Sequence, residues 1–117
     1  MEQRAGVSSG RLCREALRAF DRLCEVERRQ AGEAAELTPR QRSRRALLVS
    51  RMQADEWLVP PTLAATVGEL VAAADRIEDP ALAAAWTDHL PVAVLACIER
   101  RSLARRLVEH DPLVYAG

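Results

Sequence analysis

The spacing of apolar residues is the feature that most constrains the fold of this chain. They recur at intervals of four, three, four and three residues at Leu63, Val67, Leu70, Ala74 and Ile77. These intervals place the side chains on one face of an α-helix, and every helix of a packed bundle needs such a face. No segment has the alternating pattern of β-branched and aromatic residues that is typical of a strand, so we expect no sheet.

Prolines and capping residues divide the chain into helices. Thr38 before Pro39 and Asp79 before Pro80 combine an N-cap residue with a proline at the first helical position. Pro91 either kinks the chain or restarts a helix. The predicted helices cover residues 10–32 or as far as 37, then 40–59, 62–77, 80–90 and 92–109.

The predicted fold class is therefore all-α, a single antiparallel bundle of four or five helices. We expect one domain, residues 1–117, with terminal segments 1–9 and 112–117, because a chain of 117 residues supplies one modest core. The side chains expected in that core, apart from the row already named, are Leu12, Cys13, Ala16, Leu17, Ala19, Phe20, Leu23, Cys24, Leu47, Leu48, Val49, Met52, Leu82, Ala85, Trp86, His89, Leu95, Ile98, Leu103 and Leu107.

Charge and cysteine content indicate a cytoplasmic protein. Seventeen Arg balance 17 acidic residues, so the chain has no overall attraction for nucleic acid or anionic membranes. No apolar run approaches the roughly 20 residues of a membrane span, and we expect no membrane association. Cys13, Cys24 and Cys97 are odd in number and unclustered, which argues against a disulfide framework.

Residues that could carry catalysis are sparse, and we expect a protein that is not an enzyme and has no cofactor. Neither His89 nor His110 has a glutamate three residues before it, and no close Cys pair exists, so a metal site is not expected. His89 and Cys97 have no identifiable third group to orient them as base and nucleophile. Phosphate-binding glycine loops are absent from the sequence.

The most basic stretch, residues 40–51, contains Arg40, Arg42, Arg44, Arg45 and Arg51. Such a cluster can bind nucleic acid. It can equally be a solvated helix face that pairs with acids of the first helix, for which the candidates are Glu25, Glu27, Glu33 and Glu36. A helix-turn-helix with its turn at Gly68 matches only in part, because the apolar row runs through Gly68 as in an unbroken helix.

Apolar and aromatic residues near helix ends are further candidates for partner binding. They are Trp57, Leu113 and Tyr115. The stretch from Phe20 to Trp57, about a third of the chain, resembles short helical flagellar export chaperones, which pair an Arg-containing helix with an LL-rich one. That resemblance implies a dimeric chaperone that shields a helix of its substrate, but it rests on residue classes and assigns no family.

The sequence thus predicts a non-catalytic helical adaptor or chaperone-like protein. It would bind a protein partner, or a second copy of itself as a homodimer, through apolar helix faces. The alternative is a small DNA-binding regulator that uses Arg40, Arg42, Arg44 and Arg45.

Overall fold

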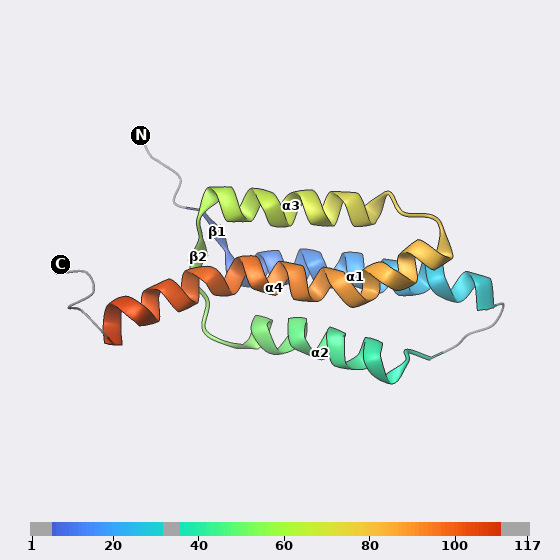
Figure 1. Cartoon of the computed structure of the whole chain (residues 1–117), viewed down its shortest axis with the longest axis horizontal. Helices are drawn as coiled ribbons and strands as arrows, with labels where there is room; N and C mark the ends of the chain where they lie inside the picture. Colours follow the sequence, from blue (N-terminus) through green and yellow to red (C-terminus); the bar gives the residue numbers. More distant parts are fainter. Residues whose placement is uncertain (1–5, 32–35, 111–117) are drawn as a thin grey trace.

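Four helices make up the bundle in a computed structural model that describes the backbone of residues 6–31 and 36–110 and the side chains of residues 6–29 and 36–99. They are α1 (Ser9–Ala31), α2 (Pro39–Gln53), α3 (Pro61–Asp75) and α4 (Pro80–His110). Successive helices run in opposite directions, and α4 lies over α1 between α2 and α3 (Figure 1). The predicted all-α antiparallel bundle is confirmed, with four helices.

The core is built around α1, which packs against the other three helices. Its apolar stripe is wide because residues at intervals of three and four face different neighbours. Cys13 and Cys24 are 0% and 1% exposed, as predicted, and Phe20 between them is also fully buried. Leu17, at the edge of the same stripe, is half-buried.

The apolar row of α3 faces the core at a slightly different angle from the one predicted. Its centre runs through Ala64, Val67, Val71 and Ala74, which are all buried. Leu70, expected at the middle of the row, is half-buried at its edge. α3 is unbroken through Gly68, so no helix-turn-helix turn forms there.

One long helix replaces the two that Pro91 was expected to separate, and the expected short fourth helix is wrong. Pro91 has no amide to donate to the carbonyl of Thr87, and its ring crowds that turn. The helix nevertheless continues, with Pro91 itself buried. At the same turn, Arg44 Nε on α2 donates to the backbone oxygen of Asp88 at 3.1 Å, so α2 is bonded to α4 beside the position where the helical hydrogen bond is missing.

A small sheet corrects two predictions at the end of the bundle where α1 begins. β1 (Val7–Ser8) pairs antiparallel with β2 (Leu58–Val59), so a sheet exists and the second helix does not reach residue 59. Leu58 and Val59 precede a tandem proline, and a residue before proline favours extended backbone. Gly6 has φ 124°, and a Cβ there would collide with the carbonyl oxygen of Val59.

α2 and the start of α4 bury fewer of the expected core residues than their sequences indicated. Leu48 is fully buried on α2, but Leu47 is 42% exposed. On α4, Leu82 is 48% exposed and Ala85 is also exposed, so the prediction that they are buried is wrong. The core side of α4 is instead formed by Ala83, Thr87, Leu90, Val94 and Ile98.

The continuous α4 also corrects the expectation that no apolar stretch is as long as a membrane span. Residues Pro80–Glu99 have a mean hydropathy of 1.5 and are long enough to cross a bilayer, by length and composition alone. In the structure this stretch packs on α1, and core helices of bundles can meet the same criterion. The stretch is therefore weak evidence for a membrane segment.

A buried charge in the α3 row tests this packing. Val67 is fully buried, whereas Ala65 on the same helix is exposed. We expect Val67→Asp to lose several kcal/mol of unfolding free energy, a large part of the roughly 5–15 kcal/mol of a small domain. Ala65→Asp is the matched control and should melt close to wild type by circular dichroism. Equal melting temperatures for the two variants would show that the row does not face the core.

Candidate functional site

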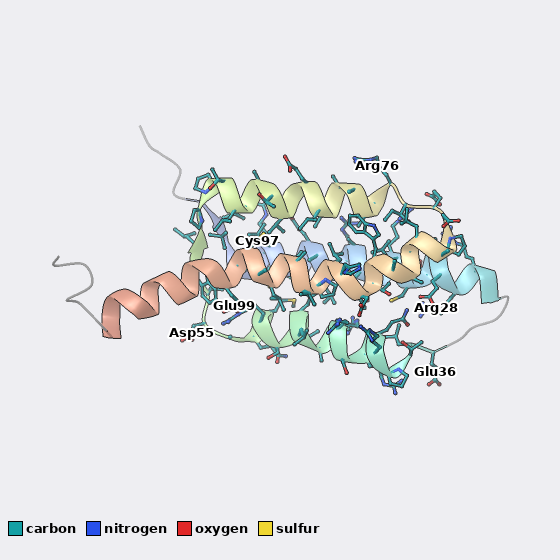
Figure 2. All side chains as sticks on the ribbon, in the orientation of Figure 1. Arg28, Glu36, Asp55, Arg76, Cys97 and Glu99 are labelled. Atoms are coloured by element: carbon teal, nitrogen blue, oxygen red, sulfur yellow. The ribbon has the colours of Figure 1, made fainter. Side chains whose placement is uncertain are left out.

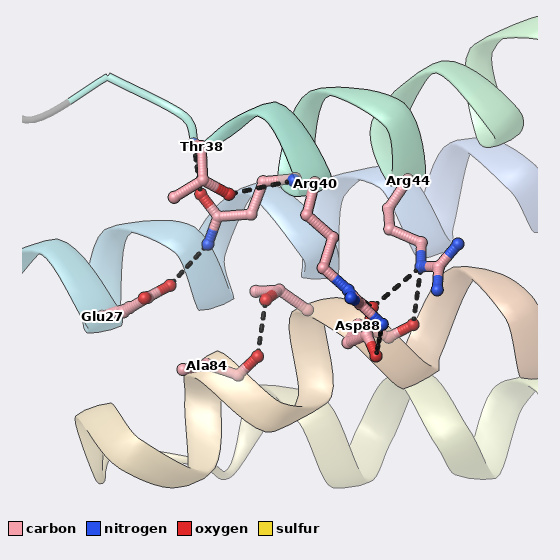
Figure 3. A pocket seen from close by; sticks show the side chains of 8 residues that line it. Glu27, Thr38, Arg40, Arg44, Ala84 and Asp88 are labelled. Carbon is pink, nitrogen blue, oxygen red and sulfur yellow. Dashed lines mark hydrogen bonds and ion pairs between the residues drawn. The ribbon is translucent and has the colours of Figure 1, made fainter.

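The arginines at the start of α2 lie against acidic residues of the neighbouring helices (Figure 3). Arg40 donates Nε and Nη2 to the two carboxylate oxygens of Asp88 on α4, with Nη2 at 2.9 Å from Oδ2. Arg44 Nε lies 3.0 Å from Asp88 Oδ1. One carboxylate therefore holds two guanidinium groups, and together with the carbonyl bond it ties α2 to α4 beside Pro91.

Two further arginines of α2, Arg45 and Arg51, reach α1 and α4 respectively. Arg45 binds Asp21 of α1 through two hydrogen bonds, of 2.9 and 3.1 Å. Arg51 Nη1 lies 2.8 Å from Glu99 Oε2 on α4, and its guanidinium carbon lies 4.4 Å from the ring centre of Trp57. These bonds and the cation–π contact hold α2 on the bundle.

The predicted acidic partners on the first helix are mostly wrong. Arg40, Arg44, Arg45 and Arg51 bind Asp88, Asp21 and Glu99 instead. Glu27 does contact α2, but it accepts its hydrogen bond from the side-chain Nε2 of Gln41 and not from an arginine. Residues 32–35, which include Glu33, lie outside the described part of the chain.

Arg42 differs from the other arginines of the stretch. Its Nη1 donates to the carbonyl oxygen of Leu37 at 2.8 Å, and its side chain has no carboxylate within salt-bridge distance among the described residues. The basic stretch contains five arginines. Within the described part of the chain, Arg42 is the one among them that has no acidic partner.

Thr38 caps α2 ahead of Pro39, as predicted, and it also forms a capping box with Gln41 that lines a small cavity. Thr38 Oγ1 accepts from the amide of Gln41, and Gln41 Oε1 accepts from the amide of Thr38, both at 3.1 Å. The cavity, of about 130 Å³, lies between the end of α1, the start of α2 and α4. The polar side chains that line it are hydrogen-bonded to one another (Figure 3). The cavity is therefore part of the junction between the three helices.

Ion pairing and burial shift the pKa values of an aspartate and two cysteines in the bundle. The hydrogen bond from Arg40 is the main cause that lowers the pKa of Asp88 from 3.8 to about 2, with a further contribution from Arg44. Burial raises the pKa of Cys13 and Cys24 to about 11, so both thiols stay protonated. No group of three or more His, Cys, Asp or Glu residues that could hold a metal ion occurs in the described segments.

Of the aromatic and C-terminal candidates for partner binding, the structure describes Trp57 alone. Trp57 is half-buried against the core, under Arg51, and its backbone exchanges hydrogen bonds with Ser9. These contacts give it a structural role at the end of α1. Leu113 and Tyr115 lie outside the described residues and stay predictions.

The surface that the sequence did not reveal is the outward face of α4. α1 covers one side of this helix and α2 and α3 flank it, whereas the opposite side faces solvent (Figure 1). The exposed positions form a row at intervals of three, four, three and four residues, which we call the α4 stripe: Leu82, Ala85, His89, Val92 and Ala96. Leu82 and Val92 are each 48% exposed.

A groove between α2 and α4 borders this stripe. It has a volume of about 220 Å³ and is lined by Leu47, Ser50, Arg51, Ala54, Leu95 and Glu99. Figure 2 shows Glu99 on the side of α4 that faces α2, and Cys97 on the side that faces α3. The exposed Leu47 adds apolar surface to this side of the bundle.

Known proteins add no further information. No family model, no curated protein and no solved structure matches the chain. The resemblance to flagellar export chaperones therefore has no support from these comparisons. Function is therefore inferred from the residues of this chain.

Acid titration tests the role of Asp88. The pKa of Asp88 is depressed in the folded state, so its stabilising effect is present above about pH 4 and is lost as the pH falls toward 2. Asp88→Asn should be less stable than wild type at pH 7, and the gap should shrink between pH 4 and 2. Urea unfolding at several pH values measures this, with Arg42→Gln as a control. A gap of the same size at pH 7 and pH 2.5 would contradict the assignment.

Proposed function

We propose that this chain is a non-catalytic, cytoplasmic adaptor or chaperone-like protein that binds a protein partner, or a second copy of itself, through an apolar helix face. The α4 stripe is the observation that supports this proposal most. Single exposed apolar residues are common on protein surfaces. The stripe differs from such residues because its members repeat at the spacing of a helix-packing seam along one helix.

The chemistry of the stripe fits a helical partner better than a small ligand. Its exposed residues include no Asp, Glu or Arg between Ala81 and Ala96. An amphipathic helix recognises such a row by placing its own apolar side chains along it. In the groove beside the stripe, Leu47 and Leu95 add apolar surface next to the Arg51–Glu99 ion pair.

The alternative, a DNA-binding regulator, has less support. It relied on the basic stretch of α2, and the side chains of Arg40, Arg44 and Arg45 are bonded to carboxylates of α1 and α4. Contact with phosphates would have to compete with these pairs. Binding to duplex DNA that weakens steeply with salt would nevertheless favour this alternative.

An affinity experiment with matched variants tests the proposal. Val92→Arg places a charge in the stripe, and Ala72→Arg places the same charge on the exposed side of α3. Both positions are exposed, so each variant should fold, with changes in unfolding free energy within about 0.5 kcal/mol. We expect protein captured from a cell lysate by wild type and by Ala72→Arg to be lost with Val92→Arg, as measured by quantitative mass spectrometry. Equal capture by all three baits would contradict the proposal.

A further inference from the structure

We infer that α2 is a lid that ion pairs hold on the bundle, and that it opens as one unit to expose Cys13 and Cys24 of α1. The other three helices stay packed when α2 opens, because α1, α3 and α4 contact one another directly. An element with few buried apolar contacts can open in this way without unfolding of the rest of a domain. The α4 stripe takes no part in the movement, so the lid does not depend on the proposed function.

α2 has less apolar attachment to the core than α3, although both helices are 15 residues long. On α3 four apolar side chains are buried. On α2 the buried side chains are Leu48 and Gln41, of which Gln41 is polar. At the edges of the core, Met52 of α2 and Leu63 and Leu70 of α3 are half-buried. Burial of apolar surface therefore holds α2 less firmly than α3.

Ion pairs attach α2 to both neighbouring helices along its length. Each arginine that takes part keeps some contact with solvent, from 18% exposed for the side chain of Arg51 to 70% for that of Arg40. Salt screens charges that solvent reaches much more than it weakens apolar packing. High ionic strength should therefore loosen α2 before the other helices. The carboxylates that hold it are Asp21 of α1 and Asp88 and Glu99 of α4.

The thiol of Cys24 lies beneath α2. Asp21 and Glu27 precede and follow Cys24 by three residues, and both accept hydrogen bonds from side chains of α2, namely Arg45 and Gln41. Residues three apart are neighbours on the surface of a helix. Cys24 therefore lies between two side chains of α1 that hold α2, and it is fully buried there.

Cys13 lies on the same side of α1, eleven residues or about three turns before Cys24. Burial is the main cause that raises the pKa of its thiol to about 11, and the charges of Arg51 and Glu99 also act on it. These two residues form the ion pair near the end of α2. The two thiols thus lie near opposite ends of α2. Opening of the whole helix exposes both, whereas fraying of one end exposes one.

Alkylation of the wild-type protein by iodoacetamide, an uncharged reagent, measures the opening. After quenching and digestion, mass spectrometry gives the rate at each cysteine separately. Raising NaCl from about 0.1 M to about 1 M shortens the screening length from about 10 Å to about 3 Å. Both Cys13 and Cys24 should then react at least about fivefold faster relative to Cys97, which lies on the side of α4 that faces α3 (Figure 2). Relative rates that do not change with salt would overturn the lid.

Arg45→Gln distinguishes opening of the whole helix from a local effect. Loss of its one partly exposed ion pair predicts a rise of about two- to fivefold at Cys24, with the same rise at Cys13. Burial is the main cause that raises the pKa of Cys24, and the charge of Arg45 partly offsets it. Loss of that charge alone would therefore slow the reaction of Cys24, so a faster reaction reports opening. A rise at Cys24 without one at Cys13 would contradict movement of α2 as one unit.

Val67→Ala is the control for unfolding of the whole domain. Val67 is fully buried on α3, so its truncation destabilises the entire bundle, yet both thiols should react at close to the wild-type rate. Arg42→Gln should also leave the rates unchanged, because Arg42 bonds to the carbonyl of Leu37 next to its own helix. If Val67→Ala accelerated both thiols as much as Arg45→Gln does, global unfolding would be the route of exposure and the lid would be wrong.

Discussion

The packing of α1 against three helices is the interaction on which the rest of the structure depends. Its apolar stripe is wide enough to contact α2, α3 and α4, and Cys13, Phe20 and Leu23 on it are fully buried. With α1 at the centre, each outer helix has one side on the core and one side in solvent. For α4 the solvent side is the apolar stripe, so the arrangement that stabilises the fold also creates the surface proposed for binding.

The arginines stabilise the positions of the outer helices around this core. Arg18 and Arg22 of α1 bond to the end of α3, where Arg22 donates to the carbonyls of Ala74 and Ile77. In the same way, arginines of α2 form ion pairs with acidic residues of α1 and α4. Most of these pairs are partly exposed, so each contributes little alone. Together they join each outer helix to a neighbouring helix, and they occupy arginines of the basic stretch that would otherwise be available to other anions.

Most of the fold could be predicted from the sequence, because helix periods and proline caps are local signals. The starts of α2 and α4 after Thr38 and Asp79 follow from capping and from the proline at the first position. The continuity of α4 could not be predicted, since a proline inside a helix is tolerated when the surrounding structure supports it. Here the ring of Pro91 is buried in the bundle, and Arg44 of α2 bonds to the Asp88 carbonyl in the same turn.

The candidate site was less predictable, for a related reason. α4 carries apolar residues on two sides, and composition alone does not tell which side faces the core. Leu82 and Ala85 looked like core residues, whereas Ala83, Thr87 and Leu90 occupy the core. The acids that bind the α2 arginines are likewise distant in sequence: Arg40 and Asp88 are 48 positions apart. Only the three-dimensional arrangement of the helices brings them together.

Hydrogen–deuterium exchange as a function of protein concentration tests the central claim most directly. If the outward face of α4 is the binding surface of this chain toward its own copy, amides of α4 should become more protected as concentration rises. Amides at the start of α2, whose arginines bond within the chain, should exchange at an unchanged rate. Protection that rises at α2 and not at α4 would contradict the account, and exchange that is independent of concentration throughout would rule out self-association through this face.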